Sequence, residues 1–487
     1  MVLAAYACLL FFDLGGGSLS HTDEYRTAER SREFHFTGDW ATVHNNFAPH
    51  FAKPPLQYWL TALTLPLTED REWAVRFWPA LGALAALAAT AWLAWVVGGK
   101  AGWAPLLAAL FCLLNLGFTV SGRSGWLDSW MMAFNTAAIA AALEARSTRN
   151  WWWVVAACIA LGAWQKAPVA ALLVGGLCLA GILRSERGFL RCAAFWKAIL
   201  VAFALTALWP LWQWSRHGDA FLHAFFVKEM VHRTGFASAG SQKFHPGVYF
   251  VMLWDSWSLL APASCAALAM IPLTRARRDR GLALLGLLVL ALFVTLSLMA
   301  FRSERYASYV VPMLSVILAV VVARRFAGWK LVACVSLLTI PAWLELPSIY
   351  DARHHDRRPQ AKLVAMDLGR SYRAGERLLL LRKPKSRMRT DVMLFYGDLP
   401  AAVTTVDAEA LDRGLQGMAE TEQGFRGIVD AGCWSLLRSH FPGARREGAF
   451  GDYIHWWAPA RDASASTAGR RCAQQLVDAA KSPRSAT

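Results

Sequence analysis

Two short charged stretches near the N-terminus hold residue types that can move a proton and bind a phosphate. In the first, TDEYRTAER, the spacing of Asp23, Arg26 and Arg30 puts an acid and two bases on one face of a helix. Thr22 can cap this helix, and Glu24 joins Asp23 in its first turn, where the helix dipole favours acids. A solvated interfacial helix whose charges pair with one another is the alternative interpretation.

The second stretch, FAKPPLQYWL, places Lys53 before a pair of prolines. A proline pair can begin a helix, and the Tyr58 and Trp59 that follow suit a helix in a membrane interface. Lys53 then stands at the positive end of that helix, where ammonium and dipole repel each other unless an anion lies between them. A phosphate would supply this anion. A surface lysine that extends along the interface is the alternative.

The rest of the chain is dominated by long apolar runs. Of its 487 residues 56% are hydrophobic, 24 are tryptophan, and the formal charge is +16. Apolar runs of about 17–25 residues are typical of a polytopic membrane protein. The basic residues form short clusters between the runs, which indicates membrane topology rather than a surface for nucleic acid. We therefore expect the lipid bilayer as a partner and no nucleic acid.

The runs predict about eleven membrane helices. They lie near residues 1–18, 73–97, 102–120, 127–144, 150–164, 167–183, 194–213, 248–271, 281–300, 306–323 and 330–348. The fifth and sixth runs are separated only by WQKAP and could form a broken or re-entrant hairpin. Basic residues gather in alternate loops, which makes those loops cytoplasmic. Acids and bases occur together in the other loops and suggest a site on that face.

The tail after residue 350 has a different pattern. Apolar runs too short to span a membrane, such as RLLLLR and DYIHWWAP, alternate with helix-like stretches, which predicts a small extracytoplasmic α/β domain. The predicted fold is therefore mainly α: a transmembrane helical bundle over 1–348, with a first periplasmic loop over 19–72, and an α/β domain over 349–487 whose end is partly disordered.

Taken in order, these motifs resemble the GT-C membrane glycosyltransferases, the group that contains the aminoarabinose transferases of lipid A and the protein O-mannosyltransferases. The motifs are DEYRTAERSREF, GDW, KPPLQYWLTAL, GRSGWLDSW, WQKAPVA, FFVKEMVHR and SERYASYVVP. The resemblance covers roughly residues 1–345 and is strongest over 21–65. It implies inverting transfer of one sugar from a polyprenyl-phosphate donor without a nucleotide.

The resemblance also implies roles for particular residues. Asp23 matches the base that deprotonates the acceptor, and Arg26 and Lys53 match positions that bind the donor phosphate. Tyr309, in a Y-x-x-P position, could donate a further hydrogen bond to that phosphate. Further candidates for substrate binding are Glu24, Asp128, Lys166, Arg302, Arg305 and His232.

Several of these candidates also have an ordinary structural explanation. Asp128 could position the acceptor or orient Arg26 or Arg123, but acids are common at helix N-termini. Arg302 and Arg305 could bind substrate or anchor a helix end at the lipid headgroups. A lone histidine such as His232 is more often a hydrogen-bonded loop residue.

The sequence departs from the aminoarabinose branch at two positions implicated in metal binding. That branch typically has a glutamate before the lysine of KPP and a histidine in the 225–233 loop. Ala52 and Met230 stand there instead. No cofactor is therefore certain, and both the need for a divalent metal and the identity of the sugar stay open.

We expect a glycosyltransferase of the bacterial inner membrane with its active site on the periplasmic side. The sugar would pass from undecaprenyl phosphate to lipid A or another surface glycan, with transfer to protein Ser or Thr as the alternative. A transporter or flippase of a lipid-linked substrate is the alternative of another class. It would need charges near the membrane midplane, at about 2.5–3.5 kcal/mol each, whereas nearly all charges here fall at the ends of apolar runs. A membrane sensor whose tail binds a ligand is a third alternative.

Overall fold

The computed structural model divides the chain into two compact units. It describes residues 2–99, 102–145, 147–166, 191–232, 248–273, 279–298, 304–348, 359–383, 386, 388–408 and 424–459. We call the first unit, Met1–Gly16, Asp39–Val43 and His50–His355, the membrane unit. The second, Gly17–Gly38, His44–Pro49 and Asp356–Thr487, is the α/β unit. The division differs from the predicted one because two pieces of the predicted first loop cluster with the tail.

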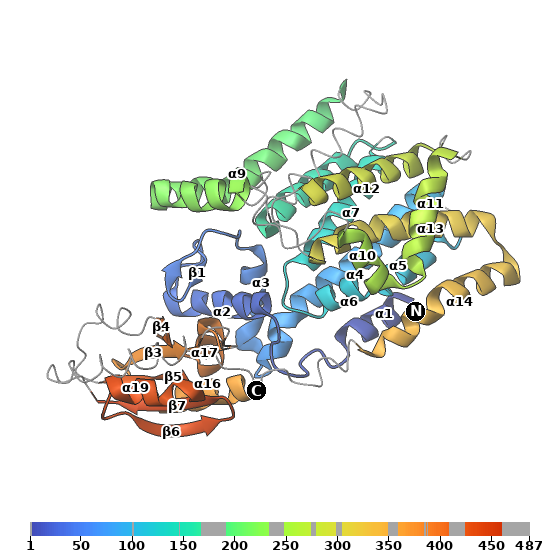
Figure 1. Ribbon diagram of the computed structural model, residues 1–487. Helices are drawn as coiled ribbons and strands as arrows, with labels where there is room; N and C mark the ends of the chain where they lie inside the picture. The colour runs from blue at the N-terminus through green and yellow to red at the C-terminus, as the bar shows by residue number, and fades with distance from the viewer. Residues whose placement is uncertain are drawn as a thin grey trace. The chain divides into compact units, whose positions relative to one another are not determined.

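The described part of the membrane unit is built mostly from helices (Figure 1). They are α1 Val2–Phe11, α3 Leu56–Thr64, α4 Arg71–Gly98, α5 Ala104–Leu113, α6 Leu116–Gly122, α7 Asp128–Glu144, a helix over 151–166, α9 Ala193–Leu222, α10 Val248–Trp257, α11 Leu260–Leu273, α12 Arg280–Leu298, α13 Val311–Arg325 and α14 Gly328–Glu345. Shorter turns are the 3-10 helices η1 Leu65–Leu67 and η5 Glu304–Val310 and the π-helix η3 His223–His232.

The core of the membrane unit forms where α4 packs against α5, α7 and α13. Small residues allow these helices to approach closely. Ala83 and Ala86 of α4 are completely buried, and a Cβ added at Gly122 of α6 would lie only 2.6 Å from the Cβ of Ala83. Gly122 therefore permits the contact between α4 and α6.

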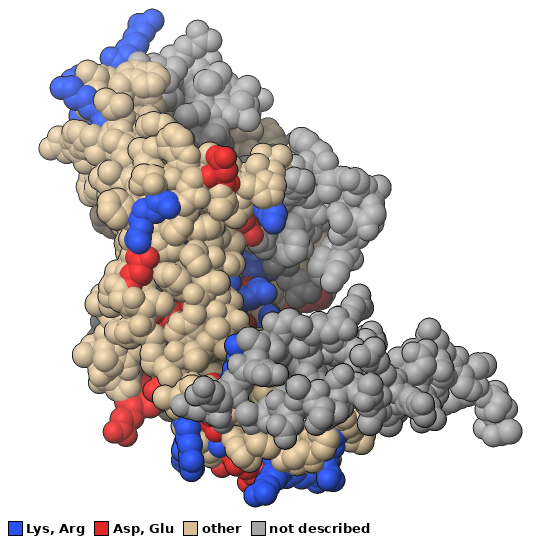
Figure 2. Space-filling view, turned by 90° about the vertical axis from the view of Figure 1, so that its left-hand side faces the viewer, with Lys and Arg blue, Asp and Glu red and all other residues tan. Residues whose placement is uncertain are grey.

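Several helices of this unit can cross a membrane. Among the described residues, α4, the helical segment Ala193–Glu229 with a kink at Gly218, α12 and the helix Arg305–Arg325 are long and apolar enough. A fifth span is added if the bent pair α5 and α6 counts as one. Large apolar side chains such as Leu200 and Phe203 of α9 are 68% and 71% exposed, as expected for lipid-facing positions. Figure 2 shows a broad face of this unit with few charged side chains. The chain is therefore a multi-pass membrane protein.

The predicted membrane helices agree with the observed ones to different degrees. The helices predicted at 73–97, 127–144 and 281–300 correspond closely to α4, α7 and α12. The run at 102–120 instead bends by 77° between α5 and α6, where the side chain of Asn115 caps the second helix. The run at 248–271 likewise divides into α10 and α11. The helix predicted at 167–183 lies outside the described residues, so the count of eleven stays a prediction.

The α/β unit contains a five-stranded sheet in the order β4-β3-β5-β7-β6. Its strands are β3 Arg377–Arg382, β4 Val403–Asp407, β5 Phe425–Asp430, β6 Arg445–Phe450 and β7 Tyr453–Ala458. Strand β3 pairs in parallel with β4 and β5, whereas β7 pairs antiparallel with β5 and β6. The helices are α2 Thr22–Thr37, α16 Pro359–Ser371, α17 Thr390–Gly397 and α19 Trp434–His440, and β1 His44–Asn45 pairs with β2 Ala48–Pro49. The predicted α/β character of the tail is confirmed.

Candidate active site

The N-terminal turn of α2 presents Asp23 and Arg26 to solvent. Nη1 of Arg26 lies 3.3 Å from Oδ1 of Asp23, and the two side chains are 41% and 32% exposed. The helix cap differs from the predicted one: His21 is the N-cap, and its Nδ1 accepts the backbone N–H of Asp23. Thr22 is instead the first helical residue, because the extended backbone of His21 lets that side chain reach the free amide.

The other charged residues of this turn are occupied within the α/β unit. Arg30, predicted to share a face with Asp23, is 7% exposed and donates from Nε to Oδ1 of Asn45 at 3.0 Å. Glu24 is 1% exposed and accepts the backbone N–H of Ser20 at 2.9 Å. This hydrogen bond holds the chain just before the helix. The Glu24 carboxylate therefore has a structural role that does not require a bound substrate.

Lys53 is paired with an anion, as its position before a helix N-terminus requires. Helix α3 begins at Leu56 with Pro55 as its N-cap, in agreement with the predicted start at the proline pair. The Nζ of Lys53 lies 2.8 Å from Oε2 of Glu229 in η3, and each side chain is 17% exposed. A carboxylate thus occupies the place at the ammonium where the sequence predicted a phosphate.

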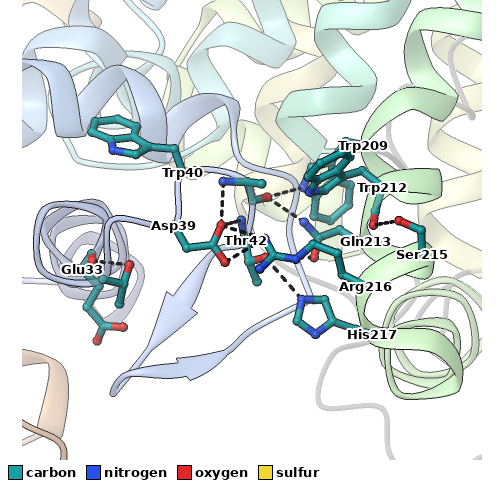
Figure 3. A network of polar contacts seen from close by, with 12 residues as sticks. Glu33, Asp39, Trp40, Thr42, Trp209, Trp212, Gln213, Ser215, Arg216 and His217 are labelled. Carbon is teal, nitrogen blue, oxygen red and sulfur yellow. Dashed lines mark hydrogen bonds and ion pairs between the residues drawn. The ribbon is translucent and has the colours of Figure 1, made fainter.

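The chain that leads to Lys53 is held by helix α9 (Figure 3). Asp39 accepts the backbone N–H groups of Ala41 and Thr42, and its carboxylate lies 3.2 Å from Nη1 of Arg216. Gln213 donates to the carbonyl oxygen of Ala41 at 2.6 Å. Burial alone would raise the pKa of Asp39, but these amides and Arg216 outweigh it and lower the pKa. Asp39 is therefore ionised and fastens this loop.

Aromatic packing continues this attachment as far as Phe51. Its ring lies 4.9 Å from that of His217 and 5.5 Å, edge to face, from that of Phe221. Both partners belong to α9, which runs directly into the π-helix η3 that carries Glu229. Insertions of this helical type are frequent at functional sites. Helix α9 is kinked at Gly218, between His217 and Phe221. It contacts the segment before Lys53 and also leads to Glu229, the partner of Lys53.

A second charged cluster of the membrane unit surrounds Asp128, the first residue of α7. Its side chain is 2% exposed, and Oδ1 accepts from Nζ of Lys166 at 2.8 Å and from the hydroxyl of Tyr309. Lys166 Nζ also lies 2.9 Å from the Tyr309 oxygen, and Nη1 of Arg305 is 3.8 Å from Oδ2 of Asp128. Four predicted site residues thus meet in three dimensions, with two cations facing one carboxylate.

Aromatic rings complete the Asp128 cluster. The ammonium of Lys166 lies 4.9 Å from the ring centre of Tyr306, and the guanidinium of Arg305 lies 4.5 Å from that of Trp126. Such contacts stabilise cations that are removed from water. Arg123, which Asp128 was predicted to orient, donates to the carbonyl oxygens of Leu9 and Leu10 at the end of α1. Its contacts support the helix end.

Two other candidates cannot be placed in this geometry. Arg302 lies outside the described residues, and His232 ends η3 with its side chain outside the described part of the structure.

In the described residues no group of three or more His, Cys, Asp or Glu side chains is arranged to hold a metal ion. Ala52, before Lys53, has no ligand atom in its side chain.

Sequence reasoning missed Glu229, Tyr306 and Trp126 as site residues. Each stands inside a motif that the sequence analysis had singled out: FFVKEMVHR, SERYASYVVP and GRSGWLDSW. An acid in a loop on the same face as Lys53 was a usable signal for Glu229. Nothing in the linear spacing shows which ring covers which cation, because these residues meet only after the helices have packed.

The site can now be compared with known proteins. The family model described as dolichyl-phosphate-mannose-protein mannosyltransferase matches residues 1–212. An undecaprenyl phosphate-alpha-4-amino-4-deoxy-L-arabinose arabinosyl transferase of Pectobacterium carotovorum is 27% identical over 71% of this chain and 62% of its own length. A protein of the same description from Sodalis glossinidius is 30% identical over 56% of this chain and 48% of its own. The chain thus spans less than two thirds of the length of these relatives.

The fold is also shared with a solved structure. The crystal structure of ArnT from Cupriavidus metallidurans bound to undecaprenyl phosphate superimposes with a TM-score of 0.76, at 17% identity, over 95% of this chain and 98% of that one. The apo structure of the same protein gives a TM-score of 0.73. The resemblance inferred from the motifs is confirmed: this chain is similar in sequence to the aminoarabinose transferases and, over its first 212 residues, to the protein mannosyltransferases, and it shares the fold of ArnT.

Proposed function

We propose that this protein transfers a single sugar from undecaprenyl phosphate to lipid A or a related surface glycan. Support comes from the names of its relatives, which use such a donor, and from the fold shared with a structure bound to undecaprenyl phosphate. We further propose that it acts in the bacterial inner membrane with its site on the periplasmic side. The alternation of basic and mixed-charge loops along the sequence supports this orientation.

The observation that carries the proposal is the ion pair between Lys53 and Glu229. Lys53 precedes the N-terminus of α3, where ammonium and helix dipole both attract an anion, and Glu229 supplies one at 2.8 Å. A phosphate is a stronger acceptor for the same ammonium than a single carboxylate oxygen. In our proposal the donor phosphate takes the place of the Glu229 carboxylate on Lys53.

Asp23 serves as the general base in the proposed reaction. Its side chain is 32% exposed, so an acceptor hydroxyl can reach it. The acceptor oxygen attacks the anomeric carbon while its proton passes to Asp23. The bond from that carbon to the phosphate oxygen breaks, and the electron pair leaves with polyprenyl phosphate, so the configuration inverts. Arg26 and Lys53 stabilise the charge that grows on the leaving oxygen.

The Asp128 cluster has a binding role in this proposal. Lys166, Arg305 and the Tyr309 hydroxyl supply donors whose positions are fixed by one buried carboxylate. Two cations around one anion leave an excess of positive charge, which favours a negatively charged headgroup. Asp128 begins α7, and Arg305 lies in the first turn of η5, just before α13. That placement supports a binding site at the membrane surface over the midplane site that a transporter needs.

A divalent metal is not needed in this scheme. Of the two positions implicated in metal binding in the aminoarabinose branch, Ala52 offers no ligand atom and Met230 offers only a thioether, a poor ligand for hard divalent ions. The residues present therefore do not fit that metal site, and we route no step through a metal.

Label transfer in membranes tests the proposed function. Membranes containing wild type, Asp23→Asn or Lys53→Ala receive a labelled undecaprenyl-phosphate sugar, and mass spectrometry of the lipid fraction reports the acceptor. We expect wild type to add one sugar mass and both variants to lose that addition. If wild type consumes no carrier-linked sugar, a transporter or sensor becomes the better hypothesis.

Transfer to protein Ser or Thr is the second candidate. The family model that matches residues 1–212 is described as a protein mannosyltransferase, which favours this acceptor. The same experiment separates the two, because label would then appear on protein that resists extraction with organic solvent.

A further inference from the structure

Helix α2, which carries the proposed base, is built into the α/β unit. Tyr25 of α2 is completely buried and meets the ring of Tyr396 in α17 edge to face, with 6.4 Å between ring centres. The hydroxyl of Tyr396 accepts the backbone N–H of Leu19 at 2.8 Å. Leu19 is buried and lies only four residues before Asp23. Tyr396 therefore holds both the body of α2 and the chain that enters it.

A second attachment connects the hairpin after α2 to the edge strand of the sheet. Nδ2 of Asn46 donates to the carbonyl oxygen of Val403 at 3.0 Å, and Oδ1 of Asn46 accepts the backbone N–H of Val403 at 2.8 Å. The side chain thus satisfies both backbone groups of a residue at the start of β4. Asn46 has a positive φ of 57°, so glycine can replace it without backbone strain.

A third attachment runs through the buried side chain of Arg32. Arg32 donates from Nε and Nη2 to the two carboxylate oxygens of Glu29 at 2.9 and 2.8 Å, and from Nη2 to the carbonyl oxygen of Leu399 at 2.9 Å. The Arg32 and Glu29 side chains are 5% and 0% exposed. The pair with Glu29 lies within α2 and fixes the guanidinium of Arg32. The bond from Arg32 to Leu399 then attaches α2 to the loop that follows α17.

We propose that Tyr396 and Asn46 are positioning residues for the transfer step, and that residues 390–403, which hold α17 and the start of β4, act as the mount of the helix that bears the base. This inference rests on the proposed role of Asp23. Tyr396 of the mount holds Leu19, just before the first turn of α2. Val403 of the mount holds Asn46, in the chain that follows α2. A rigid mount reduces the range of directions in which the Asp23 carboxylate can point, which is what a proton transfer requires.

The test uses the full-length protein in lipid nanodiscs and two conservative variants. Tyr396→Phe removes only the hydroxyl that accepts Leu19 N–H, and Asn46→Gly removes both bonds to Val403 while keeping the backbone conformation. We measure kcat with labelled donor, the Kd for undecaprenyl phosphate, and the unfolding temperature. We expect kcat to fall about tenfold in each variant, since small misplacements of reacting groups are costly, while the Kd changes less than twofold.

A matched control separates positioning from general loss of stability. Leu437 of α19 is completely buried in a cluster with Leu379, Leu381 and Trp456, whose members all come from the tail. Leu437→Ala should lower the unfolding temperature at least as much as the two test variants while kcat stays within twofold of wild type. An unchanged kcat in Tyr396→Phe and Asn46→Gly would overturn the inference, and so would a kcat that merely follows the unfolding temperature in all three variants.

The proposed function and the inference can fail separately. If Asp23→Asn transfers sugar as fast as wild type, Asp23 is not the base. The inference that the mount positions the base then fails as well. If Asp23→Asn is inactive while Tyr396→Phe and Asn46→Gly keep full kcat, the base assignment survives and only the positioning role is wrong.

Discussion

Asp23 and Asp128 are both acids at helix N-termini, but their surroundings are opposite. Asp128 is 2% exposed and contacts Lys166, Arg305 and Tyr309, whereas Asp23 is 32% exposed and contacts Arg26 at 3.3 Å. A carboxylate held by two cations is a poor proton acceptor and a good organiser of neighbouring donors. A partly exposed carboxylate can meet a substrate. The comparison therefore agrees with our proposal, in which Asp23 accepts the proton and the Asp128 cluster binds substrate.

The largest expected effect concerns Asp23, the proposed base. Asp23→Asn keeps the size and helix-start compatibility of the side chain but cannot accept a proton. We expect kcat for sugar transfer to fall by about 10²- to 10⁴-fold, the usual contribution of a general base, with an unchanged Kd for undecaprenyl phosphate. Single-turnover transfer and lipid binding measure the two quantities.

The matched control for that variant is Asp70→Asn. Asp70 is an exposed acid that caps α4 through the backbone N–H of Trp73, and asparagine caps a helix equally well. This variant should keep wild-type kcat. A wild-type rate in Asp23→Asn would remove the distinction between the two acids.

The second-largest expected effect concerns Asp128, and the quantity that changes is the free energy of unfolding. Asp128→Ala leaves Lys166 and Arg305, whose side chains are 12% and 25% exposed, without their carboxylate. We expect a loss of about 3 kcal/mol in the free energy of unfolding, the lower end of the cost of breaking a buried pair. Adding Lys166→Met should recover part of this loss because one unpaired cation is then removed. Denaturant titration in micelles measures both. The single variants Asp128→Ala and Lys166→Met are measured as well. If the double variant loses as much unfolding free energy as the two single variants together, Asp128 and Lys166 are not coupled.

Glu33 is a third acid that can be compared with Asp23 and Asp128. It is fully buried in α2, the helix that carries Asp23. Burial, followed by the neighbouring Glu29, raises the pKa of Glu33 from 4.5 to about 8, whereas the backbone N–H of Phe47 acts to lower it. The protonated form can donate to Glu29. Between these two pKa values the folded unit binds more protons than the unfolded chain, so stability falls as pH rises, by up to about 1.4 kcal/mol per pH unit.

Replacing this acid by its amide should flatten that dependence. The amide of Glu33→Gln resembles the protonated acid and can donate to Glu29 and accept from Phe47. We therefore expect the variant to gain stability over wild type as pH rises from 5 to 8, while the two stay equal near pH 4. Hydrogen exchange of α2 amides as a function of pH measures the difference. A constant difference across this range would mean that Glu33 does not titrate there.

Much of the fold was predictable because membrane spans are encoded locally. The helices α4, α7 and α12 follow from length and hydropathy, and the start of α3 follows from its proline pair. The breaks between α5 and α6 and between α10 and α11 were missed, because a capping Asn115 or a positive φ at Ser258 leaves the apolar run intact.

The candidate site was predictable in its residue types but not in its pairings. Residues Asp128, Lys166, Arg305 and Tyr309 were named from three separate motifs. Their meeting depends on helix packing, which joins Asp128 to Tyr309 across 181 positions of sequence. The assignment of α2 to the α/β unit was not foreseeable from the sequence, because it depends on contacts such as Arg32 to Leu399 that join residues 367 positions apart. Periodicity shows which residues share a helix face, but it does not show what covers that face.

The smallest expected effect concerns Glu229, whose pairing is intermediate between the two acids of the comparison. Its ion pair with Lys53 is only 17% exposed, yet the proposed donor must displace it. Glu229→Gln keeps a hydrogen-bond acceptor for the ammonium and removes the competing charge. A partly buried pair of this kind is worth about 1 kcal/mol, so undecaprenyl phosphate should bind roughly three- to tenfold tighter. Asp219→Asn, an exposed acid of α9, should leave the Kd unchanged. Weaker binding in Glu229→Gln would mean that the carboxylate supports the donor site, because an acid that only competes with phosphate for Lys53 cannot lower the affinity when its charge is lost.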